Sequence, residues 1–405
     1  MMPPSAPATP LPAPPLARSF DEEDEDTDHL SPKALAELEA ARLLREQQIG
    51  QRPGTLTLRA DAMAPRLMLT TYDEDFFHEH EYANYDELLH FFRQHPDKKH
   101  WLDVRGYNDL GLMQRLMDDF RIHPLQMEDV LGDYQRAKVE ETDDGLFLVS
   151  RMTEFTRLLD IEDDQLSIFT GDNYVLTFQD DYDDCLEAVR VRLRLGRTNL
   201  RRRTPLYLAY ALTDVVLDHY YPTMAAIGDY IETLEERIFQ GRADRRVLNR
   251  ILRIKKDIVR FRRLVYPERE KIAELLRMPD EDVPEEIKVF FKDCYDHAIQ
   301  ALDLAESYRE TVSSLVELYM SDQSNRANEV MKVLTIISSI FIPLSFIVGL
   351  YGMNFQREGP NGQVNYLNMP ELYSPWGYPT LLAFLLLVVI FQLAYFYRKG
   401  WLTNK

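Results

Sequence analysis

Two long uncharged apolar runs near the C-terminus constrain this chain more than any other feature. Val333–Leu350 spans 18 residues and Pro379–Tyr397 spans 19, and neither contains a charged side chain. Each run roughly matches the ~20 residues that a helix needs to cross a hydrocarbon core about 30 Å thick. Both runs are apolar all round, whereas a helix on the surface of a soluble domain is apolar on one side. We therefore expect two transmembrane helices rather than a buried helix hairpin.

Basic residues flank the two runs on one side of the expected membrane. Arg326 and Lys332 precede the first run, and Arg398, Lys399 and Lys405 follow the second. The loop between the runs carries little positive charge. By the positive-inside rule, both termini face the cytoplasm and the loop faces outward. The chain is therefore expected to be an integral protein of the plasma (inner) membrane with two spans.

Charge and cysteine content exclude some classes of protein. The chain has 67 acidic against 47 basic residues, a formal net charge of -20, so we expect no nucleic-acid partner. Cys185 and Cys294 are the two cysteines of the sequence. Two cysteines build no disulfide framework, and a reducing compartment is the expected surrounding of the polar part.

The N-terminal half divides into two segments. Residues 1–60 are Pro-rich and acidic, and we expect them to be disordered apart from a short helix over Pro32–Gln48. Residues 61–204 combine short apolar runs between turn residues with helical spacing over Tyr85–His95 and Asp109–Phe120, which predicts an α/β domain. The predicted strands are Leu67–Thr71, Trp101–Val104, Gly145–Met152, Leu166–Thr170 and Asn173–Phe178.

Helical periodicity dominates after Thr204. Over residues 205–283, two long helices with dense charges between their apolar positions are predicted, and a short turn between them makes them antiparallel. Gly241 and Pro267 are expected to break the helical pattern. The predicted helices are Leu206–Phe239 and Arg245–Arg277.

A third helical pattern begins at about Pro284 and runs without Pro or Gly until Pro343. Continued to Leu350, it would form a rod of roughly 100 Å at about 1.5 Å per residue, starting in water and ending in lipid. The expected fold class is therefore α+β, with a cytoplasmic α/β domain followed by long helices and two C-terminal transmembrane helices. The C-terminal segments are a stalk and first span over 284–351 (the span at about 333–350), an extracytoplasmic loop over 352–378, the second span over 379–397 and a basic cytoplasmic tail over 398–405.

One stripe of the first span differs from the rest of it. Two helices cannot enclose a pore, so a conducting chain must oligomerise around this span. Small and polar side chains recur there at alternating spacings of three and four, and such a stripe either packs against other helices or lines a path. The stripe consists of Asn328, Met331, Thr335, Ser338, Ile342, Ser345 and Gly349, with Leu334 beside it.

A motif at the end of the first span points to a family. The span ends in Tyr351-Gly352-Met353-Asn354-Phe355, and here the chain resembles the CorA family of divalent-cation channels, whose signature is Gly-Met-Asn at the end of the first of two spans. The resemblance covers roughly residues 66–405. Other similar stretches are Asn328–Thr335, Met369–Leu372, Trp376–Pro379, His123–Leu125, Glu128–Val130 and Asp293–His297.

The resemblance implies a homopentameric funnel in which each stalk helix continues into an inner pore helix and the second spans form an outer ring. Gly352, Met353 and Asn354 would form the selectivity filter at the outer mouth. The residues of the stripe and Leu334 would line the conduit, and Glu371 lies in the outer loop. The implied regulatory metal site between subunits involves Asp129 and Asp293, with Glu317 as a weaker candidate.

The implied function is influx of hydrated Mg²⁺ driven by the membrane potential and gated by cytoplasmic Mg²⁺. Mg²⁺ would thus be both transported and regulatory, and the chain would be no enzyme and have no catalytic residues. Its partners would be further copies of itself, the lipid bilayer and divalent metal ions. A Zn²⁺ transporter, including a proton-coupled one, or a Co²⁺ or Ni²⁺ transporter stays open within the family, and a non-conducting membrane-anchored metal sensor is the alternative from another class.

Two charged motifs that do not belong to the stretches carrying the resemblance favour structural roles. His78 and His80 would share one face of a strand, with Glu79 and Glu81 on the other, which is not the helical His-Glu-x-x-His pattern of a metal site. The arginines between Arg192 and Arg203 form a basic stretch. In a chain this acidic, an internal electrostatic partner is the expected role of that stretch.

Overall fold

The computed structural model describes residues 52–59, 62–132, 134–155, 161–196, 199–353, 358 and 362–402. The helix predicted over Pro32–Gln48 lies outside these residues. The chain forms two compact units, one of residues up to Tyr221 with Leu264–Gln300, the other of Pro222–Arg263 with Ala301–Lys405. These boundaries differ from the expected ones at residues 204 and 283, because each long helix is divided between the two units.

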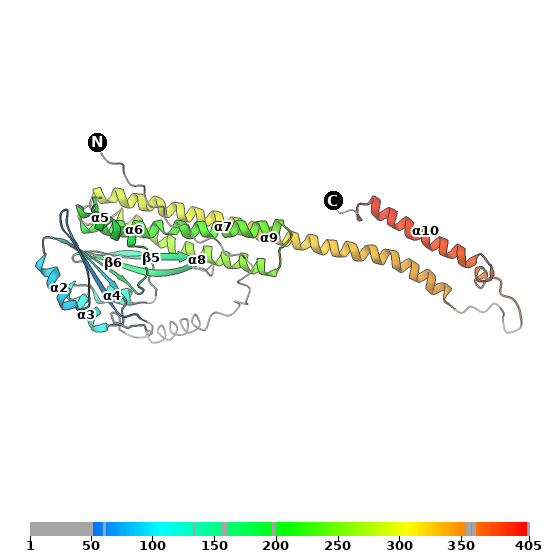
Figure 1. The fold of residues 1–405 in the computed structure, drawn as a ribbon, viewed down its shortest axis with the longest axis horizontal. Helices are drawn as coiled ribbons and strands as arrows, with labels where there is room; N and C mark the ends of the chain where they lie inside the picture. The colour runs from blue at the N-terminus through cyan, green and yellow to red at the C-terminus, as the bar shows by residue number, and fades with distance from the viewer. Residues whose placement is uncertain are drawn as a thin grey trace, which may run out of the picture. The chain divides into compact units, whose positions relative to one another are not determined.

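A seven-stranded sheet forms the centre of the first unit, in the order β2-β1-β3-β7-β6-β5-β4 (Figure 1). β3 and β7 are parallel, and the other neighbouring pairs are antiparallel. The strands are β1 (Arg66–Tyr72), β2 (Phe77–Tyr82), β3 (Lys99–Arg105), β4 (Lys138–Thr142), β5 (Gly145–Phe155), β6 (Ile161–Thr170) and β7 (Tyr174–Gln179). The five predicted strands are confirmed. β2 and β4, the two edge strands of the sheet, were not among the predicted strands, because their polar side chains hide an apolar alternation.

Three helices cover one face of the sheet: α2 (Tyr85–Gln94), α3 (Leu110–Asp119) and α4 (Pro124–Leu131). The side chains of Asn84 and Asp109 accept hydrogen bonds from the first turns of α2 and α3, so each helix begins where its cap dictates. The apolar sides of the helices and the sheet share one core. Leu56 and Leu58 pack against this core, so the ordered domain begins before residue 61.

Three further helices lie wholly in the first unit. They are α5 (Glu187–Leu195), the short helix η1 (Asn199–Arg201) and α6 (Pro205–Asp218). α6 packs across β5, β6 and β7, and most of its side chains are buried. The rings of Tyr207 and Tyr210 lie 5.1 and 5.2 Å from the ring of Phe290, which fixes α6 against the helix that follows residue 284.

The second unit contains α10 (Gly377–Arg398), the short helix η2 (Pro370–Tyr373) and large parts of three long helices. These are α7 (Tyr220–Phe239), α8 (Arg245–Leu275) and α9 (Glu285–Tyr351). α7 and α9 approach closely at Gly228, where a Cβ atom would lie 2.4 Å from the hydroxyl of Tyr308. An ion pair of 3.1 Å between Arg262 and Glu306 joins α8 to α9.

Two predictions about the long helices are wrong. The helix predicted over Leu206–Phe239 is divided into α6 and α7 at His219, whose Nδ1 lies 2.9 Å from the carbonyl oxygen of Val215 and helps to end the first helix. The break predicted at Pro267 does not occur, and α8 continues through it. Proline removes one backbone hydrogen bond, and the buried contacts of the residues that follow Pro267 offset this loss.

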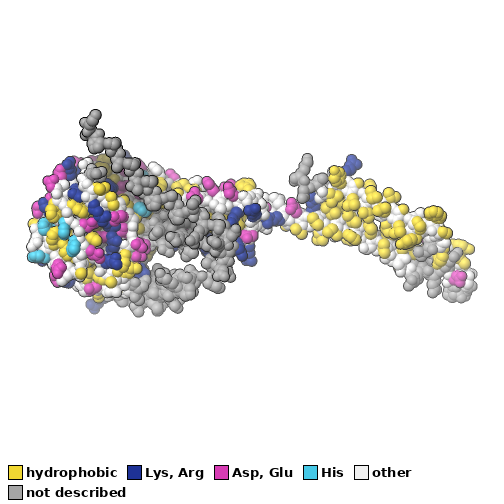
Figure 2. Space-filling model, viewed as in Figure 1, with side chains coloured by type: hydrophobic (Ala, Val, Ile, Leu, Met, Phe, Trp, Pro, Cys, Tyr) yellow, Lys and Arg dark blue, Asp and Glu magenta, His cyan; other side chains and the backbone are white. Residues whose placement is uncertain are grey.

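The long helix predicted from Pro284 is confirmed as α9, which has 67 residues and is therefore roughly 100 Å long. α9 and α10 each contain a stretch apolar enough to cross a membrane, and 6% and 11% of these stretches are buried within the chain. Figure 2 shows hydrophobic side chains gathered over α10 and the C-terminal part of α9. The amide of Gln392 on α10 donates a 3.0 Å hydrogen bond to the carbonyl oxygen of Ser339 on α9.

Candidate pore face and cation cluster

The predicted stripe forms one continuous face of α9. Met331, Leu334 and Ile342 are 57%, 62% and 66% exposed, and a Cβ atom added at Gly349 would have nothing within 4 Å. Asn328, Thr335 and Ser345 are exposed as well, and Ser338 is half-buried. In a single chain, a membrane-length helix therefore leaves its polar stripe uncovered.

The second span lies away from this stripe. Ser339 contacts Gln392 of α10, and the half-buried positions around it are Ile336, Ile340, Pro343 and Ile347. At about 100° per residue, these positions fall on the side of α9 roughly opposite the stripe. α10 thus covers the apolar side of α9 and leaves the stripe for other contacts.

The hydroxyl groups of the stripe differ in what they can offer. Thr335 Oγ1 donates to the carbonyl oxygen of Met331 at 2.7 Å, so its donor is already used within the helix. The side-chain hydroxyl groups of Ser338 and Ser345 form no hydrogen bond within the described part of the chain. The oxygen of each of the three hydroxyl groups can accept a hydrogen bond from water, but Ser338 and Ser345 are the ones whose donor is also unused.

The end of the first span is partly described. After α9 ends at Tyr351, the amides of Gly352 and Met353 still donate to carbonyl groups one turn back, at 2.9 and 3.2 Å. Met353 is 53% exposed. Asn354 lies outside the described residues. In the loop, Glu371 is exposed and lies in η2.

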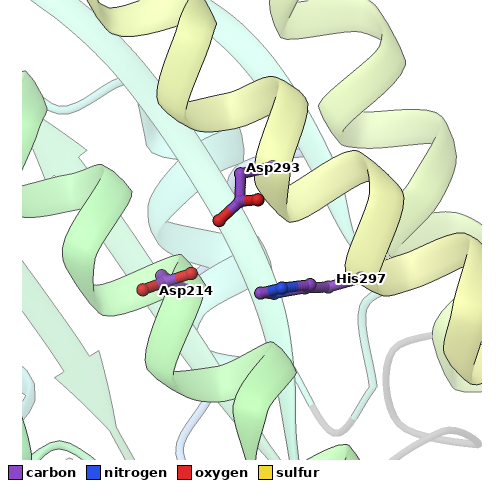
Figure 3. Close-up of side chains that lie close together, drawn as sticks. All are labelled: Asp214, Asp293 and His297. Atoms are coloured by element: carbon purple, nitrogen blue, oxygen red, sulfur yellow. The ribbon is translucent and has the colours of Figure 1, made fainter.

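Asp214, Asp293 and His297 form a cluster that can hold a cation (Figure 3). Asp214 comes from α6, and Asp293 and His297 lie four residues apart on one side of α9. One oxygen or nitrogen atom from each residue lies within 4.8 Å of the others. Two carboxylates and an imidazole suit a divalent metal, and the nitrogen ligand favours a transition metal over Mg²⁺.

The surroundings make Asp214 sensitive to a cation. Burial, together with the negative charge of Asp218, raises the pKa of Asp214 above its ordinary value. The thiol of Cys294 lies 3.7 Å from Asp214 Oδ1, and burial raises the pKa of this thiol well above its usual range. A positive charge at the cluster would therefore stabilise the ionised form of Asp214.

The other predicted regulatory residues lie elsewhere. Asp129 on α4 forms an ion pair of 2.6 Å with Lys138, so within one chain it already has a cationic partner. Glu317 is exposed on α9. Of the cluster, Asp293 was predicted from the sequence, whereas Asp214 and His297 were not. The four-residue spacing of Asp293 and His297 on a predicted helix was the available signal for the histidine, whereas Asp214 joins through tertiary structure.

The two charged motifs have structural partners. The rings of His78 and His80 stack on one face of β2, 6.1 Å apart, as the alternation predicted. Arginines of the basic stretch form ion pairs with acidic residues of the same unit, which confirms their predicted internal role. The pairs are Arg194 with Glu79 and Glu187, Arg202 with Glu74, and Arg203 with Glu286.

Comparisons with known proteins agree with this architecture. The family model for the CorA-like Mg²⁺ transporter protein matches residues 97–398. The cobalt/magnesium transport protein CorA of Thermotoga maritima is 35% identical over 355 residues, covering 87% of this chain and 97% of that protein. The putative metal ion transporter YfjQ of Bacillus subtilis is 32% identical over 302 residues, covering 75% and 89%.

A solved structure shares the fold. The complete structure of the CorA magnesium transporter from Methanocaldococcus jannaschii matches with a TM-score of 0.65 and 22% sequence identity, covering 83% of this chain and 99% of that one. At this identity, the likeness extends to the arrangement of the sheet, the long helices and the apolar C-terminal helices.

Proposed function

Because the chain belongs to the CorA-like Mg²⁺ transporter family, we propose that it is a membrane channel for hydrated Mg²⁺. The observation that carries this proposal is the uncovered stripe on α9, which follows the helix through its whole apolar part on the side away from α10. Further copies of the chain would bring their stripes together around one axis. A homopentamer with cytoplasmic termini in the inner membrane is the arrangement that we propose.

The mouth of this channel would recognise the ion with its water shell. Mg²⁺ prefers six oxygen ligands and loses water reluctantly, so a pore can select the hydrated ion. An amide oxygen accepts hydrogen bonds from that water, and Asn354 would supply one from each subunit. No Asp or Glu occurs from Val333 to Gln356. Neutral oxygens allow the ion to leave again, which conduction requires.

The driving force needs no chemical step. An ion gains roughly 2.3 kcal/mol per charge per 100 mV, and hence a divalent cation about 4.6 kcal/mol. Below the mouth, Met331, Leu334 and Ile342 would form an apolar constriction that closes by losing its water. Ser338 and Ser345 would let water re-enter when the constriction widens.

Ion uptake into vesicles tests the proposed function directly. The full-length protein is reconstituted, and uptake of Mg²⁺, Co²⁺, Ni²⁺ and Zn²⁺ is measured with and without a pH gradient. We expect Mg²⁺ flux that follows the membrane potential and is independent of the pH gradient. Zn²⁺ flux that needs the gradient, without Mg²⁺ flux, would instead establish a proton-coupled zinc transporter. No flux of any ion would favour a metal sensor.

Gating would depend on cytoplasmic cations at the acidic residues of the α/β unit. A cation that binds the closed state more tightly than the open state shifts the population toward closure. We propose Asp293 as the central ligand, with the carboxylates of Asp214 of the same chain and Asp129 of a neighbouring subunit binding Mg²⁺. His297 would add a nitrogen ligand when the bound cation is a transition metal such as Co²⁺. Glu317 on the stalk is a further candidate contact.

Neutralising the cluster should weaken this inhibition. For Asp293→Asn, we expect the concentration of internal Mg²⁺ that halves uptake to rise on the order of tenfold, since one charged ligand is lost. Asp296→Asn is the matched control, because it removes an exposed carboxylate from the same helix outside the cluster. Inhibition of Asp293→Asn equal to that of Asp296→Asn would remove Asp293 from the sensor.

Lowering the pH should also raise the concentration of internal Mg²⁺ that halves uptake, because protons compete with the cation for Asp214, whose pKa is raised.

A further inference from the structure

The end of the α7–α8 hairpin is strongly basic in an otherwise acidic chain. Residues 237–263 contain 11 lysines and arginines against Asp244 and Asp257, whereas the whole chain has a net charge of -20. Figure 2 shows Lys and Arg side chains gathered where this end of the hairpin lies beside α9. Some of these residues have partners within the chain, as Arg262 has in Glu306, so the charge available to another partner is that of the unpaired arginines at the turn.

Contacts with α9 fix the position of this hairpin end along the axis of α9. The side-chain amide of Gln323 donates to the carbonyl oxygen of Ala243 at 3.2 Å. The guanidinium of Arg326 donates to the carbonyl oxygen of Gly241. Arg326 is seven residues before the apolar run, which begins at Val333. The turn between α7 and α8 therefore lies about 10 Å along the helix axis from the start of that run.

At about 10 Å from the start of the apolar run, the turn lies close to the lipid headgroups. The headgroup layer adds about 5 to 7 Å on each side of the hydrocarbon core. An extended arginine at the turn can thus reach the headgroups, well within a screening length of about 8 Å at physiological salt. Basic residues farther along α8 lie outside that range.

The side chains at the turn are suited to such a surface. Arg242 and Arg245 are exposed and form no ion pair within the described part of the chain. Asp244 caps α8 by accepting a 3.0 Å hydrogen bond from the amide of Val247. Beside them, Phe239 is 71% exposed. An exposed aromatic ring next to unpaired arginines is the combination that binds a membrane interface.

We propose that the α7–α8 turn, through Arg242, Arg245 and Phe239, docks on anionic lipid headgroups of the leaflet at which α9 enters the membrane. The inference rests on the membrane placement of α9 and α10 and is independent of the ion that is carried. A neighbouring copy could offer carboxylates to the arginines, but it would give no reason for the exposed ring at headgroup level. Docking there would tie the hairpin to the bilayer surface.

Hydrogen exchange in nanodiscs tests the proposal with the full-length protein. Discs contain phosphatidylcholine alone or with phosphatidylglycerol, and the exchange of the amides of residues 239–246 is measured. We expect the anionic lipid to slow this exchange. In the variant Arg242→Gln with Arg245→Gln, the slowing should fall by at least fivefold, since each basic residue near a membrane contributes roughly a fivefold factor.

A matched control keeps the charge loss equal. Arg253→Gln with Lys256→Gln removes two exposed, unpaired positive charges from the same helix, roughly 12 to 17 Å farther along it from Arg245. This variant should keep the effect of phosphatidylglycerol. An equal loss in both variants, or no effect of the anionic lipid on the wild type, would overturn the proposal. The arginines would instead contact a neighbouring copy if Arg242→Gln with Arg245→Gln dissociates the oligomer in phosphatidylcholine and phosphatidylglycerol has no effect on the exchange.

Discussion

Replacing Asn354 with Ala is expected to abolish selective Mg²⁺ uptake and to leave assembly intact. In the proposed pentamer, one substitution removes an amide acceptor from every subunit at once. Each lost hydrogen bond to the water shell costs about 1 kcal/mol. If only half of the five bonds form in the wild type, their loss still costs about 2.5 kcal/mol, which corresponds to roughly a hundredfold loss of uptake. Uptake of Mg²⁺ into vesicles is the measurement, with the oligomeric state checked by size.

Two variants separate recognition of the water shell from a general disturbance of the outer loop. Asn365→Ala removes an exposed amide from the same loop and should leave uptake unchanged. Asn354→Asp keeps the oxygen but adds a fixed charge, so the ion should bind more tightly and leave more slowly. Full retention of Mg²⁺ preference in Asn354→Ala would contradict recognition through the water shell.

The sequence predicted the elements with strong local patterns. The two spans follow from uncharged runs, and α9 follows from a long periodic stretch without Pro or Gly. The strands with apolar alternation were predicted, whereas the edge strands β2 and β4 were not among them, because an edge strand needs few buried side chains. A local sequence pattern does not predict a helix boundary that tertiary contacts determine. At Pro267, buried groups hold the helix together although the pattern predicted a break.

The candidate sites show the same division. The stripe on α9 was visible because a helix repeats every 3.6 residues, and its exposure in the structure agrees with that pattern. Only part of the cation cluster could be predicted from the sequence. Asp293 and His297 share a helix, but Asp214 lies about 80 residues earlier, on a helix whose packing against α9 depends on Tyr207, Tyr210 and Phe290.

A second large effect is expected from a buried ion pair that no sequence pattern revealed. Glu268 and Lys271, one turn apart on α8, have side chains that are 0% exposed and 2.5 Å apart. Lys271 Nζ also donates to Ser150 Oγ at 2.5 Å, and Glu268 Oε1 accepts from the amide of Arg151 at 2.9 Å. These contacts attach the end of α8 to β5.

Removing one partner leaves the other as an uncompensated buried charge. For Lys271→Ala, we expect the free energy of unfolding to fall by about 3 to 5 kcal/mol, because the carboxylate of Glu268 loses its counter-ion in a buried site. Loss of helical circular dichroism on heating measures the effect. Lys288→Ala is the control, since its partner Asp280 is 72% exposed, and such a pair contributes about 1 kcal/mol or less.

A double substitution distinguishes the cost of an unpaired charge from loss of packing. Glu268→Leu with Lys271→Met removes both charges and keeps side chains of similar volume. Because a buried ion pair costs much of its attraction in desolvation, the double variant should be more stable than Lys271→Ala and close to the wild type. A double variant as unstable as the single one would mean that the hydrogen bonds to Ser150 and Arg151, rather than charge neutrality, hold α8 on the sheet.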